Sequence, residues 1–590
     1  MSPFLQERNL FVTPLSPIHI GNGLDIDPTD YVIEGDFLYG FNPADGVLNS
    51  KQREELGLLA RQGDLLAIQR FFRKYASHFL PFAQMIAAVC PGFKKEYDNH
   101  LGQVRQNNEA GNQIYNQFFV SRHTTTGVAH QPYIPGSSLK GSVRTAWLDI
   151  VLTQALHSLP VHRRNARVRR NEQLDSALGL DINFAKNPFR LFKVSDVMPT
   201  RELLTEILYS IVWYQEKALE RRQNSGISNR LECLTAGQYR GLHASVSLPA
   251  IPADKAALAS RDKKNKLQVP EKYFLDAQGR FELELLAKRC NAFYGNLLLA
   301  ELDYLQSAAG QGQATWCRTV RALLFNPDSE LRKKLAQGQA FLVRIGSQVG
   351  RDSITFNDEL RAHVTIDRES DQKMEALRES PKTKTLAAAY SNAESDFLPF
   401  GWAVVEIDPI EDCKALEQWC AQIEFAGYKV NQLADIVQQK KEQFKVRRRD
   451  LRAQIAQQEQ VEQKARIEAK KRAEEERLKA EKKAKLEAQR LSSMTENERK
   501  IEGIRKACEE WAAQLPPHGN FKKQSTNPGE VGIYQDTNRL VKEALEDESW
   551  TAEERQLLAN TIEEWLPQVV GPWNARSERR RLKINQLRQK

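Results

Sequence analysis

The sequence predicts an α+β protein that continues into a long helix and a small all-α domain. Short apolar runs of strand length end at glycine-containing turns, and segments with helical periodicity lie between them, which is typical of mixed helix and sheet layers. The residues between Gly427 and Gly503 include neither glycine nor proline, which favours one long helix. The length of 590 residues leaves room for about four domains.

The chain divides into four expected parts. These are a first domain at 1–250 with a helical insertion at about 49–106, a second domain at 251–410, a long charged helix or coiled coil at 411–502, and a C-terminal helical domain with a basic tail at 503–590. A polar, lysine-rich connection at 252–269 marks the boundary between the first two domains. The basic tail at 576–590 is expected to fray.

The first domain begins with strand signals. Residues 10–20 have strand character and end at a predicted Gly21-Asn22-Gly23 turn. Short strands at 31–33 and 37–39 form a predicted hairpin. Residues 49–106 then read as helical, because their apolar residues recur at helical spacing.

The second domain combines a long helix with strands and a glycine loop. Residues 281–307 form a predicted amphipathic helix, and strands are expected at 340–345 and 403–407. The first of these strands runs into the glycine loop Gly346–Gly350. Glycines there either let the backbone approach a ligand closely or simply form a hairpin turn, and spacing does not separate the two interpretations.

The most informative stretch is residues 133–148, which read YIPGSSLKGSVRTAWL. Pro135 favours extended backbone before it, and residues 136–138 supply a turn and a helix N-cap. The apolar residues that follow repeat at helical spacing to about residue 156. Because Lys140 and Arg144 are four residues apart, they share one face of this predicted helix.

A glycine-rich turn at a helix start offers free backbone N–H groups and the positive end of the helix dipole. Together with Lys140 and Arg144, this turn predicts a binding site for a phosphate backbone. The alternative is an ordinary strand–turn–helix with an exposed basic face. Gly136 and Gly141 have the spacing of a Walker P-loop, but Ser142 and Val143 follow where that motif needs Lys and then Ser or Thr. We therefore exclude a P-loop nucleotide hydrolase.

The composition predicts a soluble, cytoplasmic protein. Charged residues make up 27% of the chain and the mean hydropathy is −0.56; we see neither a membrane span nor a secretory signal. The 7 cysteines are scattered and form no Cys-x-x-Cys pair, so we expect reduced thiols without a disulfide framework or zinc site. No cofactor and no metal are expected.

The formal net charge of +9 is unevenly placed. Residues 440–500 contain 20 Lys/Arg and 12 Asp/Glu, so the predicted long helix carries most of the excess and the rest is near neutral. The isoelectric point alone therefore does not predict nucleic-acid binding. Local basic clusters at 163–170 and 261–266 are either RNA-facing loops or solvated charge runs.

The predicted long helix has a weak apolar seam. Val437, Phe444 and Leu451 repeat by sevens, but Gln458 and then alanine follow, which makes a poor coiled-coil core. Its Lys, Glu and Ala fit a solvated single helix or one half of a weakly paired hairpin. We expect the chain beyond Gly427 to contribute little to folding of the earlier domains, and either to stay solvated or to dock on a neighbouring subunit or on RNA.

The motif PGSSLKGxxR at 135–144 resembles the signature of the RAMP superfamily, the RNA-binding subunits of CRISPR effector complexes. Further matching stretches are TPLSPIHIGNG at 13–23, DYVI at 30–33, NPFRLFKVSD at 187–196, RIGSQVG at 344–350 and LPFGW at 398–402. In this order they are similar to the subunit 5 family of type III-A Csm complexes. The resemblance covers about residues 11–407, and the chain departs from the family beyond them.

The resemblance implies two ferredoxin-like (RRM-like) RAMP domains and a non-catalytic subunit that caps the 3′ end of the guide RNA (crRNA) in a Csm-like interference complex. It implies a part in crRNA maturation and antiviral defence, with crRNA and other Csm-like subunits as partners, notably the backbone RAMP subunit. Sugar–phosphate contacts would position RNA without reading its sequence. The candidate RNA-binding residues are His19, Arg122, Gly136, Ser137, Ser138, Lys140, Gly141, Arg144, Lys193, Gly346, Gly350 and Arg351.

Other functions remain as alternatives. His19 or His123 would serve a metal-independent, guide-processing endoribonuclease of the same superfamily, although a general base needs a positioned partner that spacing does not show. Asp30 has a context similar to that of the aspartate with which the related backbone subunit cleaves target RNA, yet a lone carboxylate is weak evidence of a nuclease. A structural adaptor that recruits a partner through its C-terminal part is a further alternative. We expect no catalysis.

Overall fold

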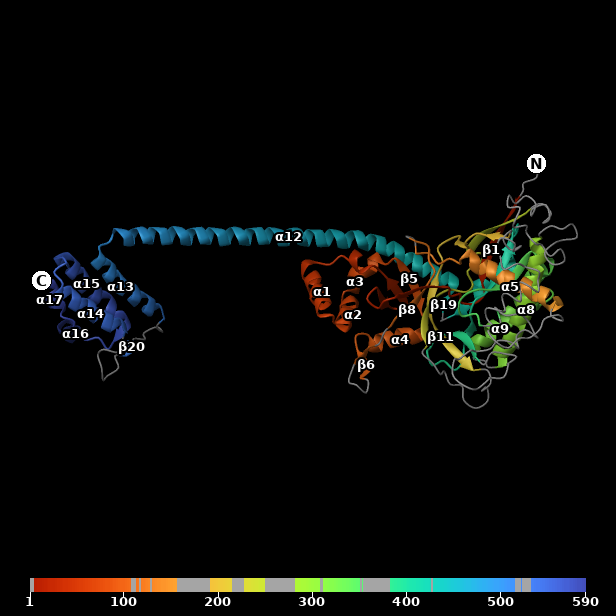
Figure 1. The fold of residues 1–590 in the computed structure, drawn as a ribbon, viewed down its shortest axis with the longest axis horizontal. Coiled ribbons are helices and arrows are strands. Elements are labelled where there is room, and N and C mark those ends of the chain that lie inside the picture. Colours follow the sequence, from red (N-terminus) through yellow and green to blue (C-terminus); the bar gives the residue numbers. More distant parts are fainter. Residues whose placement is uncertain are drawn as a thin grey trace, which may run out of the picture. The chain divides into compact units, whose positions relative to one another are not determined.

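The computed structural model of the protein describes residues 5–107, 113–115, 118–127, 130–155, 192–214, 228–249, 282–307, 311–350, 353, 383–425, 428–514, 521–522 and 532–589. The chain forms two compact units, Met1–Glu459 and Gln460–Lys590 (Figure 1). The first unit combines two large sheets with helices, so the predicted α+β class is confirmed. The ferredoxin-like arrangement of its halves stays a prediction.

One sheet of the first unit has six antiparallel strands. Its order is β10 (Met198–Pro199), β13 (Leu242–Pro249), β1 (Leu5–Pro14), β17 (Trp402–Ile407) and β14 (Ala340–Arg344), and β9 (Lys193–Val194) also pairs with β13. Every residue of β14 and β17 is buried, so both faces of the sheet are covered there. Since β1 pairs with both β13 and β17, residues 1–250 and 251–410 share this sheet.

The second sheet has nine strands. Its order is β2 (Gly21–Ile26), β8 (Val120–His123), β12 (Asn229–Leu234), β11 (Thr205–Tyr214), β5 (Met85–Val89), β4 (Phe37–Gly40) and β3 (Tyr31–Glu34), while β15 (Thr383–Ala388) pairs with β11 and with β16 (Leu398–Pro399). The β11–β5 and β12–β8 pairs are parallel and the others antiparallel. The hairpin predicted at 31–39 is confirmed as β3–β4.

The glycines predicted to form a turn after residue 20 lie instead in β2. The pairing of β2 with β8 shifts its register between Gly21 and Asp25, and Gly23 has a φ of 80°. Such an irregularity needs the backbone freedom that glycine provides, so the same residues that favour a turn also accommodate an irregular strand.

The predicted helical insertion at 49–106 contains a strand, so its purely helical assignment is corrected. Its helices are α1 (Ser50–Gln62), α2 (Leu65–Lys74), α3 (Ala76–Phe79) and α4 (Pro91–His100), with a 3₁₀ turn at Leu80–Phe82; another 3₁₀ turn, Pro43–Asp45, precedes the insertion. Between them β5 is buried along its whole length between β4 and β11. A strand buried on both faces lacks the alternating pattern that identifies strands in a sequence. The hairpin β6 (Val104–Asn107) and β7 (Gln113–Tyr115) follows.

Helices pack beside the six-stranded sheet. They are α5 (Gly136–Ala155), α8 (Leu283–Ser307), α9 (Gln311–Phe325), α10 (Glu330–Gln337) and α11 (Lys414–Gln422), which is followed by the short pair β18 (Glu424–Phe425) and β19 (Tyr428–Lys429). The helices predicted at 136–156 and 281–307 are thereby confirmed. Because α5 and α8 contact each other and β14, the predicted central motif rests on the sheet.

A buried carboxylate joins α8 to both sheets. Glu301 lies 3.2 Å from Arg344 Nη2 and 3.4 Å from Lys384 Nζ, and its Oε2 accepts a hydrogen bond from the Trp402 indole N–H at 2.7 Å. Burial alone would raise the pKa of Glu301, but these three neighbours lower it below its usual value. The charge is therefore kept in the core by complete pairing.

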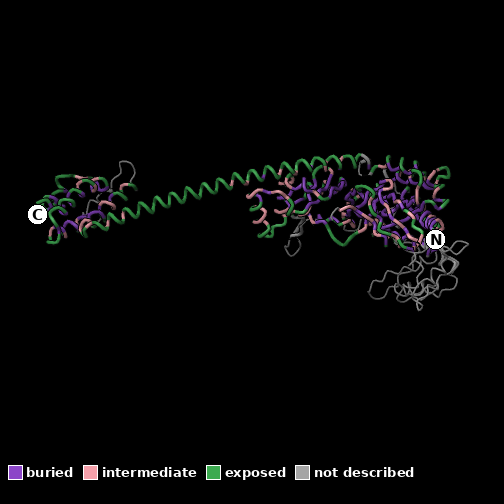
Figure 2. The backbone as a smooth tube through the Cα atoms, turned by 90° about the horizontal axis from the view of Figure 1, so that it is seen from above, coloured by how far each residue is buried: buried purple, intermediate pink, exposed green. Residues whose placement is uncertain are grey.

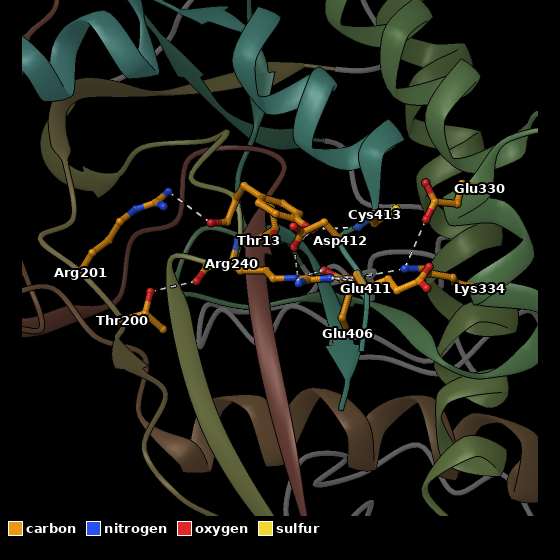
Figure 3. Close-up of polar contacts among 11 residues, drawn as sticks. Thr13, Thr200, Arg201, Arg240, Glu330, Lys334, Glu406, Glu411, Asp412 and Cys413 are labelled. Atoms are coloured by element: carbon orange, nitrogen blue, oxygen red, sulfur yellow. Dashed lines mark hydrogen bonds and ion pairs between the residues drawn. The ribbon is translucent and has the colours of Figure 1, made fainter. Parts of the chain in front are cut away.

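Arg240 fastens the start of β13 to β17 and to the segment before α11 (Figure 3). Its Nε and Nη2 donate to the two oxygens of the Glu406 carboxylate at 2.9 Å each, and its Nη1 donates to Asp412 at 2.8 Å. Its backbone N–H donates to the Thr13 hydroxyl at 2.9 Å. Arg240 has a φ of 45°, which side chains rarely allow, so these contacts hold a strained turn.

A long helix is present as α12 (Val430–Ser493), which has 64 residues. It is shorter than the expected 411–502, because α11 and the β18–β19 pair precede it and a new helix begins at Glu496. The beginning of α12 belongs to the first unit, where it buries Val430, Leu433, Val437 and Phe444 against Phe37, Tyr39, Leu80, Ile86, Ala88 and Leu204. From residue 460 to the end of α12 at Ser493, nearly every residue of the helix is exposed (Figure 2). The outer part of the helix therefore buries little, as expected. The expectation is wrong for the first four turns, which pack against the first unit.

The second unit contains the rest of α12 and a helical domain. The domain consists of α13 (Glu496–Gln514), α14 (Gly532–Glu546), α15 (Ala552–Val569), α16 (Ala575–Arg581) and α17 (Ile584–Gln589), with the short pair β20 (Phe521–Lys522) and β21 (Val570–Gly571). The basic tail was expected to fray, which is wrong for 575–589: Leu582, Ile584 and Leu587 are buried in the domain core. No described helix in either unit is long and apolar enough to span a membrane.

Candidate nucleic-acid interface

Two glycine-containing segments from opposite ends of the first unit's sequence meet at His19. The His19 carbonyl accepts hydrogen bonds from the Ser347 N–H group at 3.0 Å and from the Ser347 hydroxyl at 3.3 Å. Gly346 has a φ of 126°, and a Cβ atom there would lie 2.6 Å from the His19 carbonyl oxygen. Only glycine fits this contact, so Gly346 lets the end of β14 approach the start of β2.

The end of β8 adjoins the same place. The N–H group and the hydroxyl of Thr124 both donate to the Ile20 carbonyl, at 2.7 and 2.9 Å. The Tyr133 N–H group donates to the Thr124 carbonyl at 3.2 Å, and Ile134 bridges Val197. The stretch that leads into α5 is therefore tied to the N-terminal glycine segment.

His19 and His123 are buried side by side, with ring centroids 6.1 Å apart. Because a carbonyl only accepts, the His19 Nδ1–H group donates to the Glu232 carbonyl at 2.7 Å. The His123 Nδ1 accepts from the Ile20 N–H at 3.1 Å, and its Nε2 donates to the Tyr133 carbonyl at 3.2 Å. Burial lowers the pKa of His19, and burial together with His19 lowers the pKa of His123 to about 3. Both rings are neutral at pH 7.

Glu232 is a buried carboxyl group beside these histidines that was not among the residues predicted from the sequence. Its Oε2 accepts from the His123 backbone N–H at 3.0 Å, and burial raises its pKa to about 7. The available signal was a glutamate between Leu231 and Cys233 in an apolar strand. That pattern does not say whether the carboxyl group points to solvent or to the core.

A carboxylate closes the first turn of α5. The Gly136 N–H group donates to Asp196 Oδ1 at 2.8 Å, and the Ser138 N–H group donates to the Pro135 carbonyl at 2.8 Å. A Cβ atom on Gly136 would lie 2.5 Å from the Ser195 carbonyl oxygen. The expectation that this glycine turn offers free N–H groups is therefore wrong for Gly136 and Ser138. Asp196 ends the NPFRLFKVSD motif at 187–196, but its partner Gly136, 60 residues away, was not predictable from spacing.

Two of the predicted basic residues act on each other electrostatically. Lys140 is half-buried on α5 and Lys193 is exposed on β9. Burial, and then the positive charge of Lys193, lower the pKa of Lys140. Neither ammonium group has an ion-pair partner within the part of the chain that the structure describes. Arg144, one turn farther along α5, is half-buried and has an interaction partner.

The remaining predicted residues vary in their surroundings. Ser137 and Gly141 are exposed on α5, and the space beside Gly141 is open. Gly350 has a φ of 75° and is likewise open. Arg351 lies outside the described residues, as do the basic clusters at 163–170 and 261–266.

Asp30 follows β2 and faces an arginine. Its pKa is raised by burial and by Asp27, and Arg122 opposes this shift. Arg122 Nη2 donates to His130 Nδ1 at 2.9 Å, and its buried Nε has no hydrogen-bond partner among the described residues. Among the residues that the structure describes, no group of three His, Cys, Asp or Glu side chains is placed to hold a metal ion.

Comparison with solved structures matches 19 chains, two of which are described here. One belongs to a Csm–crRNA–target RNA ternary complex of a type III-A CRISPR-Cas system, with 17% identity and a TM-score of 0.37; the match covers 68% of this chain and 100% of that chain. The other is Csm5 of T. onnurineus, with 14% identity and a TM-score of 0.35; that match covers 67% of this chain and 100% of that one.

Comparison at the level of sequence is clearer. No curated protein matches the chain. The family profile of the RAMP superfamily, in contrast, matches residues 11–378, which is more than half of the chain. This range includes both glycine segments, the α5 motif and the Lys140–Lys193 pair described above. The chain belongs to the RAMP superfamily.

Proposed function

We propose that this chain is the non-catalytic RNA-binding subunit that caps the 3′ end of the crRNA in a type III-A CRISPR (Csm-like) interference complex. In this role it supports crRNA maturation and antiviral defence by limiting how far a nuclease trims the guide. Its partners are crRNA and the other subunits, notably the backbone RAMP subunit, and it acts in the cytoplasm. Membership of the RAMP superfamily and the order of the sequence motifs support the proposal.

The observation that carries the proposal is that α5 contacts β9 and brings Lys140 near Lys193. The two like charges repel each other and have no ion-pair partner among the described residues. A phosphate group beside both ammonium groups would offset this repulsion, and it would be recognised through charge without regard to base identity. Ser142 donates to the Arg344 carbonyl at 3.2 Å, so α5 is fixed at the end of β14, where the Gly346 loop begins. The lysines therefore belong to a rigid part of the first unit, which favours a positioning role.

A guide-processing endoribonuclease that uses His19 or His123 is the second candidate, and target cleavage through Asp30 is the third. General acid–base catalysis needs a group that exchanges protons near the working pH. The hydrogen-bonded, neutral rings of the two histidines support the non-catalytic proposal instead. For Asp30, the opposing Arg122 supports a structural interpretation.

Binding of guide RNA at several salt concentrations tests the proposal. For the assembled complex, Lys140→Ala/Lys193→Ala should weaken crRNA binding and reduce the slope of log K against log salt by about 1.4, as expected for two phosphate contacts on a single strand. Sequencing of the bound guides should show altered 3′ ends. The control is Lys51→Ala/Lys95→Ala, which removes two exposed charges elsewhere in the first unit. An unchanged slope with unchanged 3′ ends would refute the proposal.

A cleavage assay tests the non-catalytic part. The purified protein, incubated with repeat-containing RNA and separately with target RNA, should produce no specific cuts. Specific cuts that disappear in His19→Ala, His123→Ala or Asp30→Ala protein would instead establish one of the nuclease candidates. Thermal unfolding of each variant shows whether such a loss comes from misfolding, since both histidines are buried.

A further inference from the structure

The charges of the C-terminal domain are segregated. Residues 496–590 contain 16 basic and 16 acidic residues, so the domain as a whole is neutral. Seven of the basic residues, but only one acidic residue, lie in the last 15 positions of the chain. A neutral domain with seven of its 16 cations and only one of its acidic residues in one terminal segment has a local excess of positive charge that its net charge does not reveal.

The only carboxylate of that segment is turned into the domain. Glu578 is buried and accepts a hydrogen bond from the Tyr534 hydroxyl. Two of the arginines are neutralised from outside the segment, because Glu563 pairs with Arg579 at 2.5 Å and with Arg588 at 2.7 Å. The cations that remain exposed without an ion pair to any described residue are Arg576, Arg580, Arg581 and Lys583.

These four cations are presented from fixed backbone. Leu582, Ile584 and Leu587, which alternate with them in the sequence, are buried in the domain core. Side chains on an anchored segment lose less freedom on binding than those of a disordered tail. Arg576 and Arg580 are four residues apart and share one face of α16, and Arg581 and Lys583 follow closely. These four residues are here called the α16 basic surface, and their anchored backbone preorganises it.

Local stability does not account for the placement of these charges. Cations at the C-terminal end of a helix are favoured by the helix dipole, which explains Arg580 and Arg581 but not Arg576, because it lies in the first turn of α16. Lys583 has a φ of 49°, where glycine or asparagine would be accommodated more easily. Lysine at this junction costs conformational free energy and keeps a positive charge on the surface.

We propose that the α16 basic surface binds the phosphodiester backbone of a nucleic acid and forms a contact separate from that of Lys140 and Lys193. Three of its four cations are arginines, whose planar guanidinium groups pair with phosphate oxygens through two hydrogen bonds. The described residues of α16 and α17 present no exposed aromatic ring on which a base could stack. Binding is therefore independent of sequence and strongly dependent on salt.

The test uses the full-length protein and a labelled 20-nucleotide single-stranded RNA, with DNA of the same length as a second arm. Both probes carry the same phosphate chemistry, so both should bind, and a preference between them identifies the sugar that is favoured. Arg576→Ala/Arg580→Ala/Arg581→Ala/Lys583→Ala should reduce the slope of log K against log salt by about 3 for a single strand. Ultraviolet cross-links to residues 573–589 should disappear as well.

Two further variants keep the result interpretable. Lys479→Ala/Lys482→Ala/Lys483→Ala/Lys485→Ala removes four exposed charges from the outer part of α12, and it should leave the cross-links to 573–589 in place. Arg576→Lys/Arg580→Lys/Arg581→Lys retains the charges and should keep most of the salt slope. Circular dichroism of each variant checks that the domain is folded.

The outcome is independent of the proposed function. In a Lys140→Ala/Lys193→Ala background the C-terminal cross-links and their salt dependence should persist, so loss of the first contact leaves this proposal standing. The proposal is overturned if wild-type protein gives no cross-link to 573–589, or if the fourfold alanine variant keeps the wild-type slope. It is also overturned if the surface binds anionic lipid vesicles or polyglutamate but neither oligonucleotide.

Discussion

The Gly136 N–H group donates to the Asp196 carboxylate at 2.8 Å, so an anion of the protein itself occupies the first turn of α5. This turn was the predicted binding site for a phosphate group. A carboxylate at a helix N-terminus satisfies the same N–H group and helix dipole that a phosphate would. The RNA contact proposed for α5 therefore relies on Lys140 and Lys193, which lie beside this turn, and not on the turn itself.

The two glycines of α5 should respond differently to substitution. Gly136→Ala places a Cβ atom 2.5 Å from the Ser195 carbonyl oxygen, and such overpacking costs about 1–3 kcal/mol. Gly141→Ala is the matched control, because it lies in the helix with open space beside it and should stabilise by up to about 1 kcal/mol. Thermal unfolding midpoints compare the two. Equal midpoints would contradict the close approach of α5 to β9.

A second glycine pair tests the contact at His19. Gly346→Ala introduces an atom 2.6 Å from the His19 carbonyl oxygen at a φ of 126°, whereas Gly350→Ala meets nothing within 4 Å and has only an unfavourable φ of 75°. We expect Gly350→Ala to cost about 1 kcal/mol and Gly346→Ala to cost clearly more. Denaturant titration measures both. The reverse order would show that the glycine loop does not rest on the N-terminal segment.

Stability should fall with rising pH because of Glu206. Burial raises the pKa of Glu206 from 4.5 to about 8, so the folded protein keeps this group protonated after the unfolded chain has ionised it. Its contribution is fully present below pH 4.5 and is lost between pH 4.5 and 8, at up to about 1.4 kcal/mol per pH unit. Glu206→Gln should therefore raise the melting temperature relative to wild type more at pH 8 than at pH 5. A pH-independent difference would contradict the buried neutral carboxyl group.

Truncation should separate the two parts of α12. A chain that ends at Glu459 keeps the buried Val430, Leu433, Val437 and Phe444 and should melt close to the first unit of the full-length protein. A chain that ends at residue 427 loses all four, each worth about 1.5–3 kcal/mol, so it should melt at a lower temperature or without a cooperative transition. This revises the expectation that everything beyond Gly427 contributes little to folding. Identical melting of the two truncated chains would restore that expectation.

Local signals in the sequence were sufficient for much of the fold. The hairpin at 31–39, the helices of α5 and α8 and the exceptional length of α12 each follow from spacing or from the absence of glycine and proline within a short window. The strand β5 was missed because burial on both faces removes alternation. The start of α12 was predicted to be solvated. Its few apolar residues pack against side chains that lie far away in the sequence, from Phe37 to Leu204, and no local pattern reveals such partners.

The candidate site was predictable in its residue types but not in its pairings. Lys140 and Lys193 were both singled out, although nothing in their spacing indicated that each would feel the other's charge. The Asp196 contact, the buried Glu232 and the neutral tautomers of His19 and His123 all depend on partners far away in the sequence. Hydrogen-bonding partners at such separations are properties of the sheets, not of any single segment.

The pairing of β1 with β17 joins residues 10–14 to residues 403–407. During synthesis at roughly 5–20 residues per second, the first strand leaves the ribosome tens of seconds before its second neighbour exists. Even its other neighbour, β13, ends only at Pro249. Throughout this interval the apolar face of β1 is open to other nascent chains and to its own unpaired strands. The six-stranded sheet therefore cannot close around β1 until nearly all of residues 1–407 have been made.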